Sequence, residues 1–378
     1  MNSDRGGVGL VMSGGGARAA YQVGFLRALA RRMPELAPPI LTGVSAGAIN
    51  AAYLASRTGS FAANVEALTE LWSTLTVDRV FHVDALRLAL RVLRTGAKLG
   101  SGGAIKEHRP YSLVDTKPLR GFLERALHAD DGALPGVAAN LALGRLRAVA
   151  ITASSYSTGQ SVTFVQGDGF DQWDRPDRKG VPAKLRVDHV MASSALPLFF
   201  PAIPVDGFYY GDGGIRLTAP LSPAVHLGAR RIVTISTRYG RTKEEADQAV
   251  TDGYPPIAQM LGVLFNAVFL DLVDADAAQL GRMNEMIEQM PPEQRGALHR
   301  VELLQLRPSR DLGKLASDYE AELPGAFRFL TRGLGTRQTR SNDLLSMVMF
   351  QPNYLTRLIE LGEADADLRA REIEEFLA

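Results

Sequence analysis

Three short stretches of this sequence combine a chemically reactive side chain with glycines. They are Ser13-Gly14-Gly15-Gly16-Ala17-Arg18, Gly43-Val44-Ser45-Ala46-Gly47 and Asp212-Gly213-Gly214. A hydroxyl becomes a useful nucleophile when a base takes its proton, and the anion formed by attack on a carbonyl needs hydrogen-bond donors. Ser45 supplies a hydroxyl, Asp212 a carboxylate, and the triple glycine supplies free backbone N–H groups. Together these groups are what acyl transfer requires.

Ser45 is the candidate nucleophile. The small residues Gly43 and Gly47 on either side permit the sharp strand-to-helix turn that exposes the Ser45 hydroxyl. A helix that begins after Ser45 also directs its positive end toward the site. The alternative is a tight turn without chemistry, because the chain has 37 glycines and one such motif alone is a weak signal.

Gly14, Gly15 and Gly16 are the candidate oxyanion hole, because residues without a Cβ let several N–H groups converge on one point. The alternative is a phosphate-binding loop. The Walker pattern lacks its G-K-[ST] end here, and alanines occupy the later glycine positions of the dinucleotide pattern. Arg18 either supports this loop, neutralises a lipid phosphate or forms a structural ion pair.

Asp212 is the candidate base, with Gly213 and Gly214 as supporting residues. It closes a short predicted strand, and a carboxylate that accepts the Ser45 proton directly needs no histidine. The alternative is an ordinary Asp-Gly turn. None of the six histidines has the position expected of a triad member; His189 is the least implausible. The sequence contains no pattern of metal ligands, so we expect neither a metal nor a cofactor.

Short apolar runs precede the first two glycine turns. Val8–Met12 and Pro39–Thr42 are predicted strands, and Ala17–Arg32 and Ala46–Ala55 are predicted helices because their apolar residues recur with helical spacing or run throughout. Two strands joined by a right-handed crossover lie parallel, so both turns are expected at the same edge of the sheet.

The remaining pattern predicts an α/β protein with a mostly parallel sheet. Further strands are expected at Arg147–Ala153, Val162–Val165, Arg231–Ser236 and Val301–Leu306, with a hairpin turn at Asp206-Gly207. Further helices are expected at Asn64–Leu75, Val83–Lys98, Leu119–Leu127, Asp188–Pro197 and within Ile257–Met290. Only helices follow residue 311. We therefore predict a core over residues 5–310 and a C-terminal helical extension, 311–378, packed on it.

Bulk composition restricts the partners and the compartment. The net charge of +1 over 378 residues argues against a nucleic-acid partner, and the absence of cysteine excludes disulfides and fits a cytoplasmic protein. The first apolar run is too short for a signal peptide, and Ile257–Leu270 is too short and too interrupted to span a bilayer. Any membrane association is expected to be peripheral. The basic stripe Arg87, Arg91, Arg94 and Lys98 fits either an anionic membrane or a solvated helix face.

In their order along the chain, the three motifs resemble those of the patatin-like phospholipase family, bacterial serine lipid acyl hydrolases included. The stretch Ala192-Ser193-Ser194-Ala195-Leu196-Pro197, followed by Phe199-Phe200-Pro201, is similar to the block that precedes Asp-Gly-Gly in bacterial members. The resemblance covers roughly residues 7–235. It implies a three-layer α/β/α fold around a mostly parallel sheet.

The resemblance also implies a mechanism. Ser45 would be the nucleophile, Asp212 the base of a Ser–Asp dyad, and Gly14, Gly15 and Gly16 the oxyanion hole, with Arg18 in support. The substrate would be a phospholipid or another acyl-ester lipid, hydrolysed through an acyl-enzyme without a metal. Three alternatives stay open: an acyltransferase with a histidine base, a catalytically vestigial lipid-binding module and a nucleotide-binding module. The sequence predicts neither head group, acyl position nor oligomeric state.

Overall fold

The computed structural model of this protein describes residues 7–82, 112–170, 172–248, 253–269, 271–296, 298–333, 335–336, 339 and 342–378. The predicted helix Val83–Lys98, with its basic stripe, lies outside the described residues. The strands are β1 Gly7–Met12, β2 Ile40–Val44, β3 Ala148–Ser155, β4 Ser161–Gly167, β5 Arg178–Pro182, β6 Ile203–Val205, β7 Phe208–Asp212, β8 Ala229–Ile235 and β9 Glu302–Leu306.

Helices connect these strands and dominate the C-terminal part of the chain. In the first part they are η1 Gly16–Ala19, α1 Ala20–Arg32, α2 Ala46–Ser56, α3 Phe61–Ser73, α4 Val77–Val80, α6 Lys117–Ala126, α7 Pro135–Ala142, α8 Val187–Ser193, η2 Gly213–Ile215, α9 Ser222–His226 and α10 Lys243–Ala246. The others are α11 Ile257–Phe269, α12 Leu272–Gln289, η3 Pro292–Gln294, α13 Leu312–Asp318, η4 Glu320–Glu322, α14 Gly325–Gly333, α15 Asp343–Val348, α16 Pro352–Leu368 and α17 Ala370–Leu377.

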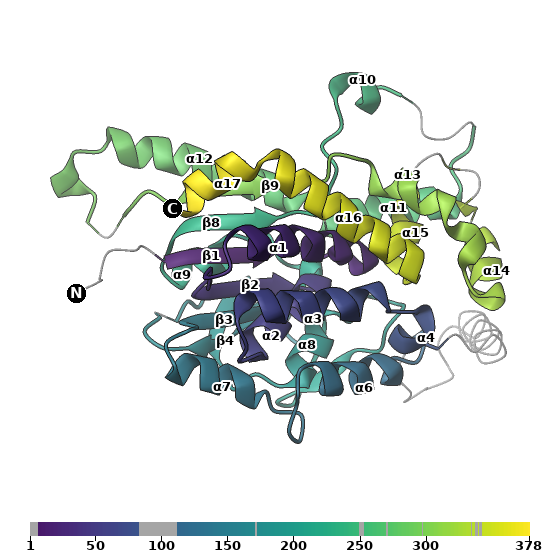
Figure 1. The fold of residues 1–378 in the computed structure, drawn as a ribbon, viewed down its shortest axis with the longest axis horizontal. Helices are drawn as coiled ribbons and strands as arrows, with labels where there is room; N and C mark the ends of the chain where they lie inside the picture. Colours follow the sequence, from purple (N-terminus) through teal and green to yellow (C-terminus); the bar gives the residue numbers. More distant parts are fainter. Residues whose placement is uncertain are drawn as a thin grey trace.

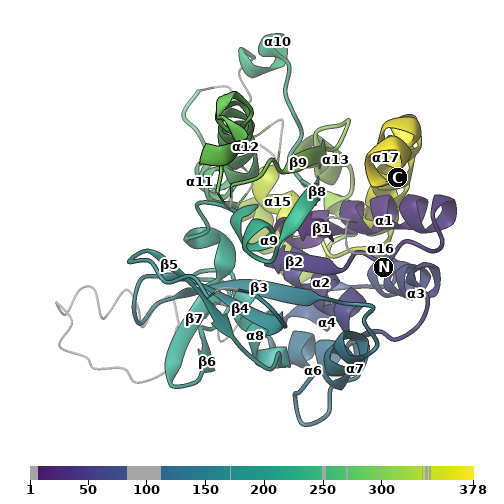
Figure 2. The same cartoon turned by 90° about the vertical axis from the view of Figure 1, so that its left-hand side faces the viewer.

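Within the described residues, the strands form one sheet in the order β5-β4-β3-β2-β1-β8-β9, with β7 beside β3 and β6 beside β7 (Figures 1 and 2). The pairs β1–β2, β1–β8, β2–β3, β4–β5 and β8–β9 are parallel. The pairs β3–β4, β3–β7 and β6–β7 are antiparallel, and the last of these is the hairpin predicted at Asp206-Gly207. The sheet is therefore mostly parallel, as predicted from the alternation of strands and helices.

Helices cover both faces of the sheet. Leu10 and Met12 of β1 join the large apolar cluster with α1, α2 and α3, whereas Val11 joins a smaller cluster with α9 and α12. Figure 2 shows α9 and α12 on one side of the sheet and α1, α3 and α16 on the other. A parallel sheet that is buried on both faces accounts for the continuous apolar runs in its strands. The predicted three-layer α/β/α architecture is confirmed.

The C-terminal helices pack closely on the first helix of the core. Tyr354, Leu355 and Leu358 of α16 are fully buried in the same large cluster as α1. The two helix backbones touch: a Cβ atom at Gly24 would lie 1.9 Å from the Ile359 carbonyl oxygen. Such an approach tolerates no side chain at that position. The helices after residue 311 thus complete the main core, and a division of the chain at that residue stays a prediction.

Several short elements were not predicted from the sequence, β5, α7 and α9 among them. β5 has the sequence Arg-Lys-Gly-Val-Pro and lies at the edge of the sheet, where charged residues and proline are tolerated and no apolar alternation is needed. The helix predicted to end at Pro197 ends at Ser193 instead. Its next residues leave the helix to contact β7, because the Asp212 N–H donates to the Ala195 carbonyl oxygen at 2.9 Å.

Candidate active site

The first two glycine turns meet at one edge of the sheet. β1 and β2 are parallel neighbours, with Met12 opposite Gly43, so both strands end at the same level. Ser45 follows β2 and is the N-cap residue of α2. Gly14 lies directly beside it, since a Cβ atom at Gly14 would be 3.0 Å from the Ser45 Cβ atom. The expected position of the two turns is therefore observed.

The backbone of Ser45 adopts a conformation that residues with a side chain rarely occupy. Its φ is 55° and its ψ is −130°, which costs on the order of 1–3 kcal/mol and persists only when neighbouring groups enforce it. Ser193 Oγ accepts the Ser45 N–H at 3.0 Å, and Ser194 Oγ donates to the Ser45 carbonyl oxygen at 3.0 Å. Ser193 Oγ in turn donates to the Thr152 carbonyl oxygen at 2.6 Å. Two hydroxyls after α8 thus hold the turn from both sides.

Gly43 and Gly47 serve the packing of this turn. A Cβ atom at Gly43 would lie 2.4 Å from the Gly47 carbonyl oxygen, and one at Gly47 would lie 2.2 Å from the Met12 carbonyl oxygen. The start of α2 therefore rests directly on the ends of β1 and β2. This contact explains the small residues around Ser45, whatever the role of the serine itself.

Asp212 lies at the end of β7 and is completely buried. Its Oδ2 accepts a hydrogen bond from Ser45 Oγ at 2.6 Å, and its Oδ1 accepts the Gly214 N–H at 2.9 Å. Gly213 rests on β3, where its Cβ atom would lie 2.1 Å from the Thr152 carbonyl oxygen. Burial raises the pKa of Asp212 to about 7, although the hydrogen bonds from Ser45 and Gly214 lower it.

The glycine loop lines the same cavity as Ser45 through Gly15 and Gly16. Gly16 has a φ of 58°, and a Cβ atom there would lie 2.1 Å from the Met347 carbonyl oxygen, so only glycine fits. The Gly14 carbonyl oxygen accepts a hydrogen bond from Thr237 Oγ1 at 2.7 Å. Among the hydrogen bonds of the described residues, none is donated by the N–H groups of Gly14, Gly15 or Gly16.

Arg18 forms a buried ion pair, which is one of the three roles left open by the sequence. Its Nη2 lies 2.6 Å from Asp343 Oδ1, and the two side chains are 3% and 12% exposed. Arg18 Nε also donates to Ser346 Oγ at 2.6 Å. Both partners belong to α15, far along the chain. The guanidinium group therefore ties the glycine loop to a C-terminal helix.

A chain of buried amide groups holds the other side of the loop. Gln22 Nε2 donates to the carbonyl oxygens of Ser13, at 2.8 Å, and Ile235, at 3.1 Å. Asn50 Nδ2 donates to Gln22 Oε1 at 3.0 Å, and Trp72 Nε1 donates to Asn50 Oδ1 at 2.8 Å. Sequence reasoning missed these residues, as it missed the hydroxyls of Ser193 and Ser194, because nothing in their spacing indicates the contacts.

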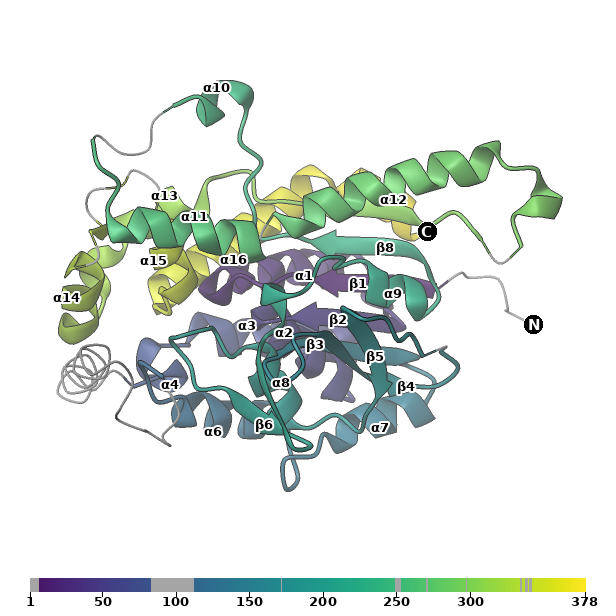
Figure 3. The same cartoon turned by 180° about the vertical axis from the view of Figure 1, so that it is seen from behind.

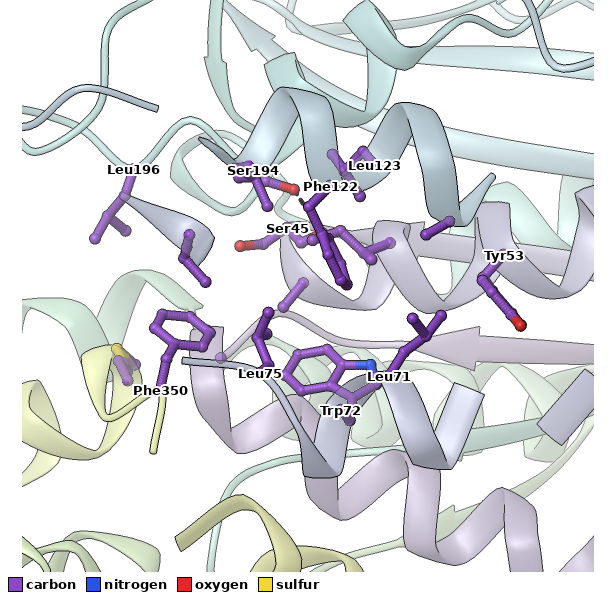
Figure 4. A pocket seen from close by; sticks show the side chains of 18 of the residues that line it. Ser45, Tyr53, Leu71, Trp72, Leu75, Phe122, Leu123, Ser194, Leu196 and Phe350 are labelled. Atoms are coloured by element: carbon purple, nitrogen blue, oxygen red, sulfur yellow. Dashed lines mark hydrogen bonds between the residues drawn. The ribbon is translucent and has the colours of Figure 1, made fainter. Parts of the chain in front are cut away.

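An apolar cavity extends from Ser45 along α2. Its empty volume is about 920 Å³, the space at its mouth included. Figure 4 shows Phe122 and Leu123 across the cavity from Leu71 and Trp72, with Tyr53 at the end remote from Leu196. The side chains of Ser45 and Asp212 lie within this largely apolar lining. The surroundings of Ser45 on this side are therefore mostly apolar.

His189 does not have the contacts of a catalytic base. Its Nδ1 accepts the Arg186 N–H at 2.9 Å, and its ring lies 4.4 Å from the Phe164 ring, centroid to centroid. Burial lowers its pKa. The carboxylate of Asp212 occupies the position beside the Ser45 hydroxyl. The structure thus places His189 in the core, where it packs as an aromatic side chain.

Fold and site together define a class of protein: a three-layer α/β/α protein in which a serine at a strand-to-helix turn is hydrogen-bonded to a buried aspartate. The chain belongs to the patatin-like phospholipase family, whose model matches residues 10–225, more than half of its length. At the level of the family, this makes the protein a lipid hydrolase. Among curated proteins the chain has no match.

Solved structures with a similar course of the chain share little sequence with it. VipD from Legionella pneumophila is 14% identical, with 94% of this chain and 67% of VipD covered and a TM-score of 0.38. Human GIVD cytosolic phospholipase A2 is 15% identical, with 98% of this chain and 59% of the human protein covered and a TM-score of 0.43. The chain thus spans about three fifths of that structure. These TM-scores are too low to carry an argument about function.

Proposed function

We propose that this protein is a lipid acyl hydrolase of the phospholipase A or lysophospholipase type, with Ser45 as nucleophile and Asp212 as general base. The observation that carries the proposal is the 2.6 Å hydrogen bond from Ser45 Oγ to a fully buried Asp212 carboxylate within an apolar cavity. A base works best when its pKa lies near the working pH, and burial raises that of Asp212 to about 7.

The reaction would proceed in two steps. Ser45 Oγ attacks the ester carbonyl carbon while its proton passes to Asp212, and the resulting oxyanion accepts hydrogen bonds from the N–H groups of Gly14, Gly15 and Gly16. The tetrahedral intermediate then breaks its bond to the alcohol, which takes the proton from Asp212 as it leaves. Water attacks the acyl-enzyme in the same way, with Asp212 again taking a proton. The second tetrahedral intermediate breaks its bond to Ser45 Oγ, which takes that proton back from Asp212 as the fatty acid is released.

Three features support this assignment over a non-catalytic role. The strained turn at Ser45 is held by two hydrogen bonds, one donated by the Ser45 N–H to Ser193 Oγ and one donated by Ser194 Oγ to the Ser45 carbonyl oxygen. The N–H groups of the glycine loop have no partner among the described residues. The cavity wall suits an acyl chain, because apolar side chains surround it over most of its length. An acyltransferase with a histidine base is disfavoured by the position of His189.

The test compares Ser45→Ala with Ser56→Ala, a matched change at the other end of α2. Ser56 donates only to the Tyr53 carbonyl oxygen and does not line the cavity. On p-nitrophenyl acyl esters and on phospholipids, Ser45→Ala should lower kcat on the order of 10⁴-fold, whereas Ser56→Ala should retain it. Both variants should unfold at nearly the same temperature as the parent.

Labelling with an alkyl fluorophosphonate gives an independent readout. An activated serine reacts readily with this reagent, and mass spectrometry of the labelled peptide should place the adduct on Ser45. Hydrolysis that persists in Ser45→Ala, or an adduct on another serine, would show that the nucleophile lies elsewhere. A parent protein that neither reacts nor hydrolyses any ester would support the vestigial lipid-binding alternative.

A further inference from the structure

Helix α11 has two apolar faces, of which the protein covers only one. Its inner face is buried and comprises Ala258, Gly262, Phe265 and Phe269. Its outer face carries large apolar side chains that are exposed by 52%, 41%, 56% and 60%, namely Ile257, Met260, Val263 and Leu264. No charged residue occurs from Gly253 to Phe269. A helix that is apolar all round normally has both faces covered, but no element of the described part of the chain covers the outer face of α11.

The inner face of α11 contacts the candidate active site at two points. Phe269 lines the cavity, and its ring lies against Gly214, where a Cβ atom would be 2.3 Å from Phe269 Cδ1. Asn266 Nδ2 donates to Asp343 Oδ2 at 2.6 Å, while Asp343 Oδ1 holds Arg18. One helix therefore contacts the turn after Asp212 and, through Asp343, the glycine loop.

The next helix keeps α11 at the surface of the protein. By length and composition alone, Ile257–Gln289 is long and apolar enough to cross a membrane. In α12, however, Asp274 pairs with Arg238 at 2.5 Å and with Arg307 at 3.0 Å, and Asp276 accepts the Leu221 N–H at 2.8 Å. These contacts tie α12 to the sheet. Of helix α11, the outer face is thus the part that is free to enter a lipid layer.

We propose that the outer face of α11 docks this protein on a lipid surface, with the cavity that Phe269 lines next to the bound helix. This inference rests on the proposed function, because a lipid hydrolase finds its substrate in such a surface. Helices that lie in a membrane interface combine an apolar face with cations that attract anionic lipids. α11 has the apolar face without the cations, so docking depends on buried apolar area and hardly on lipid charge.

Flotation with phosphatidylcholine vesicles tests the docking. The parent protein should float with the vesicles, equally well in low and high salt. The double variant Val263→Asp/Leu264→Asp should bind at least about 100-fold more weakly than the parent. Burial of each of the two aliphatic side chains contributes more than about 1.4 kcal/mol, and this free energy equals a factor of ten in affinity. Leu143→Asp is the matched control, since Leu143 is 61% exposed after α7, remote from α11 (Figure 3), and it should bind like the parent.

Hydrolysis of a soluble short-chain ester separates this inference from the proposed function. All three proteins should hydrolyse p-nitrophenyl butyrate at the same rate, whereas only the double variant should lose activity on vesicles. A parent that hydrolyses the soluble ester but does not float refutes the docking and leaves the hydrolase assignment intact. The parent protein could instead sediment as a dimer and the double variant as a monomer. This result would assign the outer face of α11 to a second copy of the chain and would also refute the proposal.

Discussion

At the scale of single residues, burial controls the chemistry of Asp212. Its carboxylate is fully buried, and the desolvation of its charged form raises its pKa to about 7 against the opposing effect of two hydrogen bonds. A carboxylate with an ordinary pKa would be a weak base toward a serine hydroxyl. In the proposed mechanism, Asp212 with its raised pKa therefore takes the place of the histidine of a Ser-His-Asp triad.

The same burial predicts how stability changes with pH. The pKa of Asp212 is higher in the folded than in the unfolded protein, so the folded state binds the Asp212 proton more tightly. The protein therefore becomes less stable as the pH rises from about 4 through about 7, where the carboxylate takes up its charge. Asp212→Asn keeps the shape and removes the charge. At pH 8 the variant should be more stable than the parent by up to roughly 4 kcal/mol, at about 1.4 kcal/mol per pKa unit.

Urea denaturation at pH 4 and pH 8 measures this difference. The gain should shrink toward zero at pH 4, where the parent also carries a neutral side chain. A variant that is less stable than the parent at pH 8 would show that the charged carboxylate contributes favourably to the fold. The variant should also lose ester hydrolysis at every pH, since an amide cannot accept the Ser45 proton.

Residue types predict only part of this site. Ser45 and Asp212 are recognisable from the glycines of sharp turns, because Ser45 stands between two such glycines and Asp212 stands before two. Ser193 and Ser194, which hold the Ser45 backbone, are ordinary serines in sequence, and their role follows from how α8 meets the turn. The catalytic roles themselves stay a prediction until the variants are measured.

At the scale of secondary-structure elements, the chain places a C-terminal helix in contact with an N-terminal loop. Asp343 of α15 accepts hydrogen bonds from both Arg18 and Asn266, so η1, α11 and α15 share one carboxylate. Strands and helices with continuous apolar runs, such as β1, β2 and α2, were predictable from sequence. The meeting of these three helices was not, because it depends on long-range packing that no local pattern encodes.

Asp343→Ala tests this junction. The change leaves the buried guanidinium group of Arg18 without its counter-charge, which typically costs about 3–5 kcal/mol. The glycine loop should also shift, and a displacement of this kind reduces kcat about 100-fold. Thermal denaturation and steady-state kinetics measure the two effects.

Glu363→Ala provides the control for that variant. Glu363 also pairs with arginines, Arg27 at 3.5 Å and Arg31 at 3.2 Å, whose side chains are 39% and 54% exposed. An exposed pair contributes about 1 kcal/mol or less, so this variant should melt and react nearly as the parent does. Equal behaviour of the two variants would mean that the Arg18–Asp343 pair does not position the loop.

At the scale of the whole molecule, the large apolar cluster runs without interruption from the sheet into the C-terminal helices. Leu312, Leu345 and Ile373 belong to the same cluster as the side chains of β1 and α2. The helical composition after residue 311 was apparent from sequence. Its full integration into the core was not, because an amphipathic helix does not reveal which surface its apolar face covers.

Removal of residues 311–378 tests this integration. The truncated protein would expose the buried face of α1 that α16 covers, together with Arg18 deprived of Asp343. We expect it to show no cooperative thermal transition by circular dichroism and no reaction with a fluorophosphonate. A truncated protein that melts cooperatively and still labels at Ser45 would establish residues 5–310 as a self-sufficient domain.

The ion pair between Arg18 and Asp343 also concerns the order in which the parts of the candidate active site are synthesised. Asp212, whose carboxylate accepts the Ser45 hydrogen bond, follows Ser45 by 167 residues, and the partner of Arg18 follows Arg18 by 325 residues. A nascent polypeptide that has not reached Asp212 therefore lacks the proposed base of Ser45. Under the proposed function, hydrolysis of lipids would begin only once Asp343 has also been synthesised and has paired with Arg18.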